Sequence, residues 1–163
     1  MPEYTHIVHP FGPLYDKDSH TLILGSLPSV ASRGQNFFYG HPQNRFWPLI
    51  AALFHRPVPE TIAQKRALCL EHGIALWDVI GECDIRLSAD GTIRNVTPND
   101  LTPIFQAARI TRVFCNGKTA GRYYERAFAP CCGIRATVLP STSPANAAYT
   151  MERLIEAWRV IAN

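Results

Sequence analysis

Apolar residues along the chain gather in four short runs, each almost continuously hydrophobic or small. These runs occupy residues 21–24, 74–77, 112–115 and 135–139. Continuous runs of this length are typical of strands buried on both faces of a sheet. Segments with a helical spacing of apolar positions lie between the runs. This alternation predicts an α/β fold in which helices cover both sides of a parallel sheet.

Helical segments alternate with the four runs. They cover residues 44–54, 59–73, 98–109 and 118–128. Gly73 is a good C-terminal stop for the second helix, and Asn99 or Asp100 can cap the third. A last helix is expected after "STSP", with Ser143 as its N-cap and Pro144 at the first helical position. Its apolar face would hold Ala148, Met151, Leu154, Ile155, Trp158 and Ile161.

Composition places the chain among globular proteins. With 163 residues, of which 47% are hydrophobic and 18% charged, it is expected to form a single domain over residues 1–163. The formal net charge is +3, and thirteen of the 16 basic residues are Arg. Arg suits bidentate recognition of phosphate, although a GC-rich genome also favours it. No segment resembles a signal peptide or membrane span, so we expect a cytoplasmic protein, and a monomer.

The five cysteines carry no metal signature. No CxxC pair is present, so neither a zinc ribbon nor an iron–sulfur site is indicated. An odd number of cysteines without an export signal predicts free thiols. The adjacent Cys131 and Cys132 could be a redox pair or an inert pair near a strand. We expect neither a metal nor an organic cofactor.

Ligands of parallel sheets bind at the carboxyl ends of the strands. Here the loops at those ends are the segments richest in Gly, Pro, Ser and Asn. They are residues 25–40, 78–97, 116–118 and 140–146. The first begins with "GSLPS", where Gly25 and Ser26 follow the strand and Gly25 permits a tight turn or a close ligand approach. This element is neither a GxxxxGK[ST] phosphate loop, nor GxGxxG, nor a GxSxG elbow.

The stretch "GQNFFYGHPQNRFW" combines aromatic rings with amides, a mixture that neither a core strand nor a solvated loop requires. Phe38 and Tyr39 lie in a Gly-bounded loop, where a ring can provide a stacking platform. Phe46 and Trp47 are expected in the core. Asn44 precedes an apolar run, so it could cap the helix or take part in the chemistry.

Polar residues also end the later strands. Asn116 could occupy a turn or read the edge of a base, and Lys118 could hold phosphate. Ser141, Thr142 and Ser143, at the expected start of the last helix, would form an anion cradle.

Two further groups have weaker support. Asp78 is the nearest acid at a strand end, and we expect it to orient the next loop rather than to act in catalysis. Nothing in the spacing favours pairing Ser141 with His41 as in a hydrolase.

Three of these loops together resemble the uracil-DNA glycosylase superfamily. The string HPxNRFW, within "GHPQNRFW", resembles the corresponding motif of the mismatch-specific uracil/thymine branch. The tail "STSPANA" and the form of "GSLPS" resemble the hypoxanthine-DNA (deoxyinosine) glycosylases. The likeness extends from the first strand to the last helix. It implies a three-layer α/β/α sandwich with a central four-stranded parallel sheet.

The resemblance also implies residue roles. Asn44 would be the catalytic amide, because Leu27 stands where mismatch-specific enzymes carry a water-activating Asn within GxNPG. Tyr39 would stack on a flipped base and Asn116 would contact it. The base-binding candidates are Tyr39, Phe38, Asn116, Gly25 and Ser26. The DNA-binding candidates are Pro140, Ser141, Thr142, Ser143, Asn146 and Lys118.

These implications describe a monofunctional DNA glycosylase that flips a deaminated base out of double-stranded DNA. It would hydrolyse the N-glycosidic bond, with hypoxanthine favoured and uracil possible, and leave an abasic site for base excision repair. No membrane and no obligate protein partner are expected. Two alternatives stay open: a non-catalytic DNA-binding module of the same fold, and a small Ser/His hydrolase.

Overall fold

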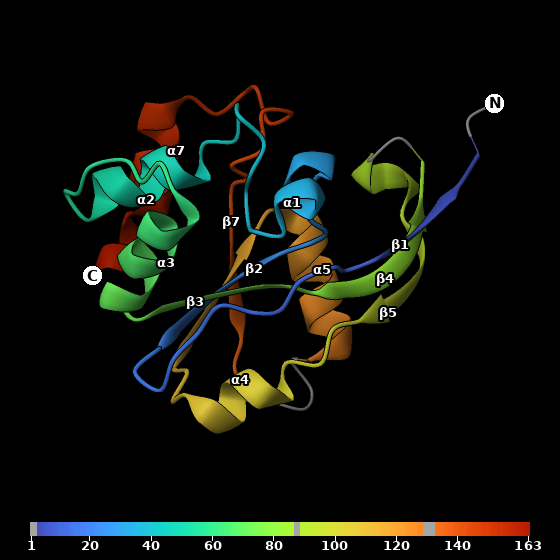
Figure 1. The fold of residues 1–163 in the computed structure, drawn as a ribbon, viewed down its shortest axis with the longest axis horizontal. Helices are drawn as coiled ribbons and strands as arrows, with labels where there is room; N and C mark the ends of the chain where they lie inside the picture. Colours follow the sequence, from blue (N-terminus) through green and yellow to red (C-terminus); the bar gives the residue numbers. More distant parts are fainter. Residues whose placement is uncertain (1–2, 87–88, 129–132) are drawn as a thin grey trace.

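A four-stranded parallel sheet lies at the centre of the fold, with the strand order β3-β2-β6-β7 (Figure 1). It is seen in a computed structural model that describes residues 3–86, 89–128 and 133–163. The strands are β2 (Thr21–Gly25), β3 (Ile74–Asp78), β6 (Arg112–Asn116) and β7 (Ala136–Leu139). The predicted central sheet is therefore confirmed, and each strand lies within one or two residues of its apolar run.

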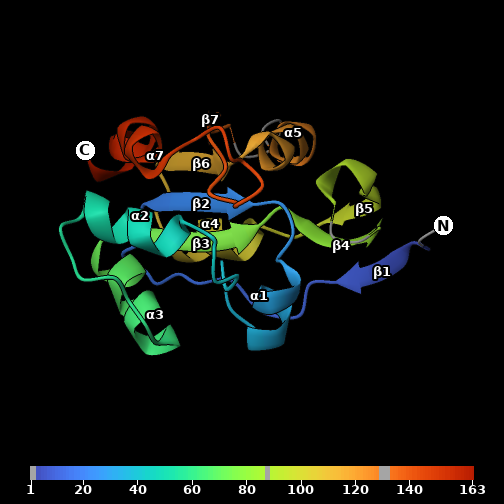
Figure 2. The ribbon, with the colours of Figure 1, turned by 90° about the horizontal axis from the view of Figure 1, so that it is seen from above.

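Helices cover both faces of this sheet. They are α1 (Val30–Gln35), α2 (Phe46–Leu53), α3 (Ile62–Glu71), α4 (Thr102–Ala107), α5 (Lys118–Ala127) and α7 (Met151–Trp158), with short 3₁₀ helices η1 (Asp90–Thr92) and η2 (Arg159–Ala162). Helices α2, α3 and α7 lie on one side of the sheet, and α5 packs against β6 and β7 on the other (Figures 1 and 2). This arrangement confirms the expected three-layer α/β/α fold.

Burial differs between the strands. Every residue of β2 and of β3 is buried. The expectation that all four strands are buried on both faces is wrong for β7, in which Val138 is 47% exposed. Strand β7 pairs only with β6, so it forms an edge of the sheet and keeps one side open to solvent.

A second, antiparallel sheet packs beside the first and was not predicted. It has the order β1-β4-β5, with β1 (Thr5–Val8), β4 (Ile80–Ile85) and β5 (Arg94–Pro98). Residues 78–97 had been expected to form a loop. Charged residues interrupt β4 and β5, and the pairing of these strands contains irregularities, so they lack a clear alternation of apolar and polar positions.

Two helices begin where the sequence did not indicate them. Helix α1 forms within the expected loop 25–40 and is capped by Ser29, whose side chain accepts the Ser32 N–H. Helix α7 begins at Met151, not at Pro144, and Thr150 is its N-cap. By contrast, α3 ends as expected, because Gly73 adopts a φ of +70° just after it.

The cysteines that the structure describes, Cys69, Cys83 and Cys115, are buried. Cys69 and Cys115 carry free thiols. Burial raises the pKa of the Cys115 thiol to about 12. Cys131 and Cys132 lie outside the described residues. Within the described part of the chain, no helix has the length and apolar character needed to span a bilayer.

Candidate functional site

A pocket of about 270 Å³ opens at the carboxyl ends of β2, β3 and β6, against the loop that follows β7. Most of the predicted site residues line it: Gly25, Ser26, Phe38, Tyr39, Asn44, Asn116, Lys118, Ser141, Thr142 and Ser143. Pro140 and Asn146 instead line an adjoining groove, which shares Lys118, Ser141 and Ser143 with the pocket. The fold thus brings together loops that are far apart in sequence.

Asn44, Thr142 and Asn116 form a hydrogen-bonded chain along the pocket wall. Thr142 Oγ1 donates to Asn44 Oδ1 at 2.9 Å and accepts from Asn116 Nδ2 at 3.0 Å. The backbone N–H of Thr142 donates to Asn116 Oδ1 at 3.0 Å, and that of Phe46 donates to Asn44 Oδ1 at 2.9 Å. Backbone N–H groups can only donate, so they identify the oxygen of each amide. Both NH₂ groups keep hydrogens that these bonds do not use.

Arg45 fastens the loop after β7 to the start of α2. Its Nη2 donates to the carbonyls of Ser143 and Asn146, both at 3.0 Å, and its Nη1 donates to the carbonyl of Tyr149. In a helix these carbonyls would accept backbone N–H groups four residues later. Here they accept hydrogen bonds from the guanidinium, so this segment stays a loop. The helix N-terminus that the anion cradle was expected to use is therefore not at Ser143, because that helix begins only at Met151; binding of DNA by Ser141, Thr142 and Ser143 stays a prediction.

Aromatic residues form the next part of the wall. The rings of Tyr39 and Phe46 stack with centroids 4.0 Å apart and planes 20° apart. Tyr39 has a φ of 53°, which is uncommon for a bulky residue. Phe38 is 2% exposed and belongs mainly to the core, although it also lines the pocket. Burial, together with the negative charge of Asp78, raises the pKa of Tyr39, so its hydroxyl stays protonated.

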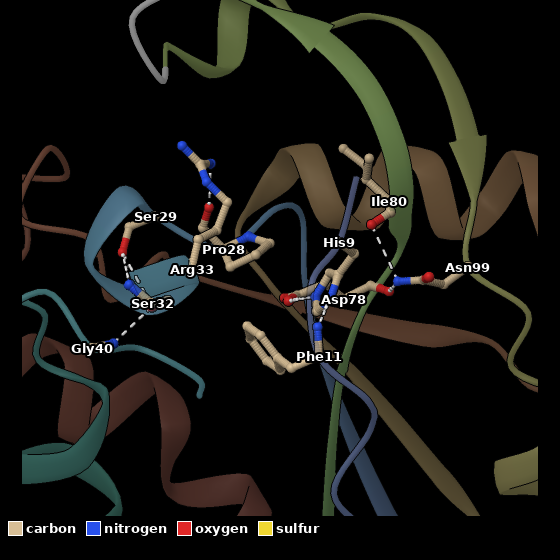
Figure 3. A network of polar contacts seen from close by, with 10 residues as sticks. All are labelled: His9, Phe11, Pro28, Ser29, Ser32, Arg33, Gly40, Asp78, Ile80 and Asn99. Atoms are coloured by element: carbon tan, nitrogen blue, oxygen red, sulfur yellow. Dashed lines mark hydrogen bonds and ion pairs between the residues drawn. The ribbon is translucent and has the colours of Figure 1, made fainter. Parts of the chain in front are cut away.

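Asp78, at the end of β3, also lines the pocket and pairs with His9 (Figure 3). His9 Nε2 lies 2.7 Å from Asp78 Oδ2, and the two side chains are 2% and 5% exposed. Asn99 Nδ2 donates to the carbonyls of Asp78 and Ile80 at 2.8 and 3.1 Å, which fixes the exit of the strand. His9 and Asp78 are 69 positions apart, so no local sequence pattern could predict that they pair. The sequence indicated only that Asp78 is an acid at the end of a strand.

A second polar network holds the loop that carries Tyr39 (Figure 3). Ser32 Oγ accepts the backbone N–H of Gly40 at 2.8 Å and the hydroxyl of Ser29 at 3.1 Å. Arg33 Nη1 donates to the carbonyl of Pro28 at 3.0 Å, and Arg33 lines the pocket. Arg33 therefore adds a cation that sequence reasoning did not single out.

The residues of the hydrolase alternative do not come together. His41 is exposed and is not among the residues that line the pocket, and its Nδ1 accepts the backbone N–H of Gln43. Ser141 Oγ accepts the N–H of Ser143. Among residues 3–86, 89–128 and 133–163, no three His, Cys, Asp or Glu side chains are grouped so as to hold a metal ion.

Comparison with known proteins connects this geometry to a family. The sequence profile of the Uracil DNA glycosylase superfamily matches residues 13–162. A protein named hypoxanthine DNA glycosylase from Methanosarcina acetivorans is 32% identical over 93% of this chain and 95% of its own length. One of the same name from Methanosarcina barkeri is 32% identical over 83% of this chain and 86% of its own.

A solved structure shares the fold. The solution NMR structure of a Methanosarcina acetivorans protein is 30% identical and superposes with a TM-score of 0.80, covering 93% of this chain and 94% of that one. The profile covers nearly the whole sequence, and the relatives match it along most of their length. The chain belongs to the uracil DNA glycosylase superfamily of DNA glycosylases.

Proposed function

We propose that the protein is a monofunctional DNA glycosylase that removes hypoxanthine from double-stranded DNA and leaves an abasic site. The observation that carries this proposal is the chain Asn44–Thr142–Asn116, which holds two amides rigidly at one pocket. The relatives named hypoxanthine DNA glycosylase support the choice of base. Uracil is a second candidate substrate. We further propose that the protein acts as a cytoplasmic monomer.

The target nucleotide has to leave the stack, because an N-glycosidic bond inside a duplex cannot be reached. Flipping costs a few kcal/mol, and less at a mismatched or deaminated base. Stacking on one aromatic ring returns roughly 1–3 kcal/mol. Tyr39 lines the pocket and is backed by Phe46, so it is the ring we assign to this contact.

The two amides are assigned different tasks. Asn44 Oδ1 already accepts two hydrogen bonds, so its NH₂ group is left to hold the attacking water near the anomeric carbon. Asn116 has one amide hydrogen that Thr142 does not use, and this hydrogen would bind an acceptor on the edge of the base. An amide is a weak base, so positioning and stabilisation of the leaving base supply most of the rate.

The groove beside the pocket is assigned to the DNA backbone. Pro140 and Asn146 line it, and Lys118 and Ser141 belong to both cavities, so a strand could run from the groove into the pocket. Lys118 is exposed, and we assign it to a phosphate rather than to a Schiff base. The reaction needs no metal and no organic cofactor.

Duplexes that contain a single deoxyinosine, uracil or xanthine test the proposal. The protein is incubated with each duplex and abasic sites are then cleaved with alkali. We expect strand breaks at deoxyinosine, and none when alkali is omitted, since the enzyme is monofunctional. If alkali produces no strand breaks in any of the three duplexes, the proposal is wrong. Tight binding to the same duplexes without product would instead favour the non-catalytic DNA-binding module.

A further inference from the structure

The proposed reaction leaves one buried pair without a task. Asp78 and His9 meet at the end of β3, with both side chains almost fully buried and the carboxylate lining the pocket. His9 comes from the segment after β1 and packs between Phe11 and Trp77, with ring centroids 4.5 Å from each. Burying an ionisable pair costs free energy, and its position in the pocket wall points to a role there.

The contacts of His9 define what Asp78 offers to the pocket. The backbone N–H of Phe11 points at His9 Nδ1, at 3.5 Å, so Nδ1 is the acceptor nitrogen and the hydrogen lies on Nε2. Nε2–H then donates to Asp78 Oδ2 at 2.7 Å. This bond fixes the rotation of the carboxyl group and leaves Oδ1 as a hydrogen-bond acceptor.

Two polar atoms at this end of the pocket are available to a ligand. Asp78 lines the pocket, and no hydrogen bond of the described residues engages its Oδ1, while the buried hydroxyl of Tyr39 makes no hydrogen bond of normal geometry and has only a weak interaction with the Asn116 side chain. Both atoms face the open side of Gly25: a Cβ there would lie 2.5 Å from Asp78 Oδ1 and 3.2 Å from the Tyr39 hydroxyl. Asp78 Oδ1 is open to the pocket and the Tyr39 hydroxyl lies beside it, so a ligand that enters the pocket can bind both.

We propose that Asp78, oriented by His9, accepts the ring N–H of the flipped-out base, and thereby selects bases in the lactam form. This inference rests on the proposed function. Hypoxanthine carries a hydrogen on N1, and uracil and xanthine carry equivalent N–H groups, whereas N1 of adenine is an acceptor. A fixed acceptor facing N1 of adenine would leave two lone pairs opposed, which disfavours adenine, the base whose deamination yields hypoxanthine.

The variant Asp78→Asn should invert this preference. His9 Nε2–H needs an acceptor, so the amide oxygen should take the place of Oδ2 and turn the NH₂ group toward the pocket. A donor then replaces the acceptor that faces the base. Bases with an unprotonated N1 should gain relative to hypoxanthine.

The test compares duplexes that contain deoxyinosine or deoxynebularine, a purine whose N1 carries no hydrogen, under single-turnover conditions. We expect D78N to lower the inosine-to-nebularine rate ratio at least about tenfold. The matched control is Asp84→Asn, since Asp84 also bonds a histidine, with His6 Nδ1 at 2.9 Å, but does not line the pocket. Its ratio should equal that of the wild type.

Equal losses on both substrates in D78N would show a merely structural role and overturn the inference alone. A wild-type protein that releases no base overturns the proposed function together with it. If D78N does not fold, His9→Phe supplies the test, because it keeps a ring between its neighbours but removes the donor. Its ratio should fall, and His9→Gln, which retains an N–H donor, should restore part of it. An unchanged ratio in H9F overturns the inference.

Discussion

The two ends of the pocket differ in how their polar atoms are satisfied. At the amide end, formed by Asn44, Thr142 and Asn116, each amide oxygen and the threonine hydroxyl have partners within the protein. At the carboxylate end, formed by Asp78, His9 and Tyr39, the structure pairs only one carboxylate oxygen with His9. The acceptors of the amide end are therefore satisfied before a ligand arrives and only its NH₂ groups keep free hydrogens, whereas at the carboxylate end an acceptor, Asp78 Oδ1, is left for the ligand.

This difference suggests separate roles, in which the amide end holds a fixed geometry and the carboxylate end selects the ligand. A satisfied network holds its members in one geometry, which is what positioning a water molecule requires. A buried hydroxyl without a good acceptor is unfavourable in the empty pocket, and a carboxylate oxygen that faces the pocket favours ligands that carry a complementary donor. We therefore expect substitutions at the amide end to change rate and stability together, and those at the carboxylate end mainly to change specificity.

The largest effect is expected for Asn44→Ala. Loss of the group that holds the water should lower the single-turnover rate on deoxyinosine by about 10²–10³-fold. The neighbouring Gln43→Ala is the matched control, because Gln43 is exposed and does not line the pocket. Its rate should match the wild type. An N44A protein that is folded by circular dichroism and has an unchanged rate would remove Asn44 from the mechanism.

Thr142→Val should have the next largest effect. The fully buried hydroxyl bridges both amides, so its removal leaves Asn116 Nδ2 without this acceptor and Asn44 without one of its donors. We expect the free energy of unfolding in urea to fall by about 1–3 kcal/mol and the rate by about 10- to 100-fold. Thr142→Ser keeps the hydroxyl and should retain most of both. Equal losses in the two variants would attribute the effect to packing.

Tyr39→Phe removes a hydroxyl that Gly25 and Asp78 adjoin, and it should act with the opposite sign. This buried hydroxyl makes no hydrogen bond of normal geometry and interacts only weakly with Asn116, so its loss should leave the free energy of unfolding unchanged or raise it by up to about 1 kcal/mol. The ring that stacks on Phe46 is retained. Urea titrations of Y39F and T142V measure the contrast directly. Destabilisation of Y39F as large as that of T142V would mean that the two ends do not differ.

The smallest effect is a pH dependence that Y39F should reduce, because buried Cys69 and Cys115 contribute to it as well. Burial raises the pKa of Tyr39 in the folded protein, whereas an unfolded tyrosine ionises near pH 10. Above that pH the unfolded chain binds fewer protons than the folded one, so stability falls as pH rises. The wild type should therefore lose stability relative to Y39F above about pH 10, by no more than about 1.4 kcal/mol per pH unit. Parallel stability curves for the two proteins would contradict this.

The sequence predicted those parts of the molecule whose signals are local. The four central strands were visible as apolar runs, and Asn44 and Asn116 were visible as amides beside predicted elements. The charged strands β4 and β5 were missed because their stability comes from pairing with each other and with β1. The pair of His9 with Asp78 was missed for a similar reason, since only the tertiary fold brings the two together.

The start of the last helix was predicted wrongly because a tertiary contact overrides a local signal. Ser143 followed by Pro144 is a normal start for a helix. However, Arg45 donates hydrogen bonds to the carbonyls of Ser143 and Asn146, which the first turns of that helix would have used for their own hydrogen bonds. A contact across the chain overrode a local preference there. The roles assigned to individual site residues remain predictions until the variants above are measured.

The bonds made by Arg45 also bear on how the protein folds. They join residues 98 to 104 positions apart, so the loop they close is nearly two thirds of the chain. Closing a loop of this length costs chain entropy, as does the pairing of β2 with β6, which joins residues 91 positions apart. We therefore expect the pocket to form together with the central sheet and not before it. Loss of DNA binding in denaturant should coincide with melting of the central sheet, which makes ligand binding a reporter of global folding.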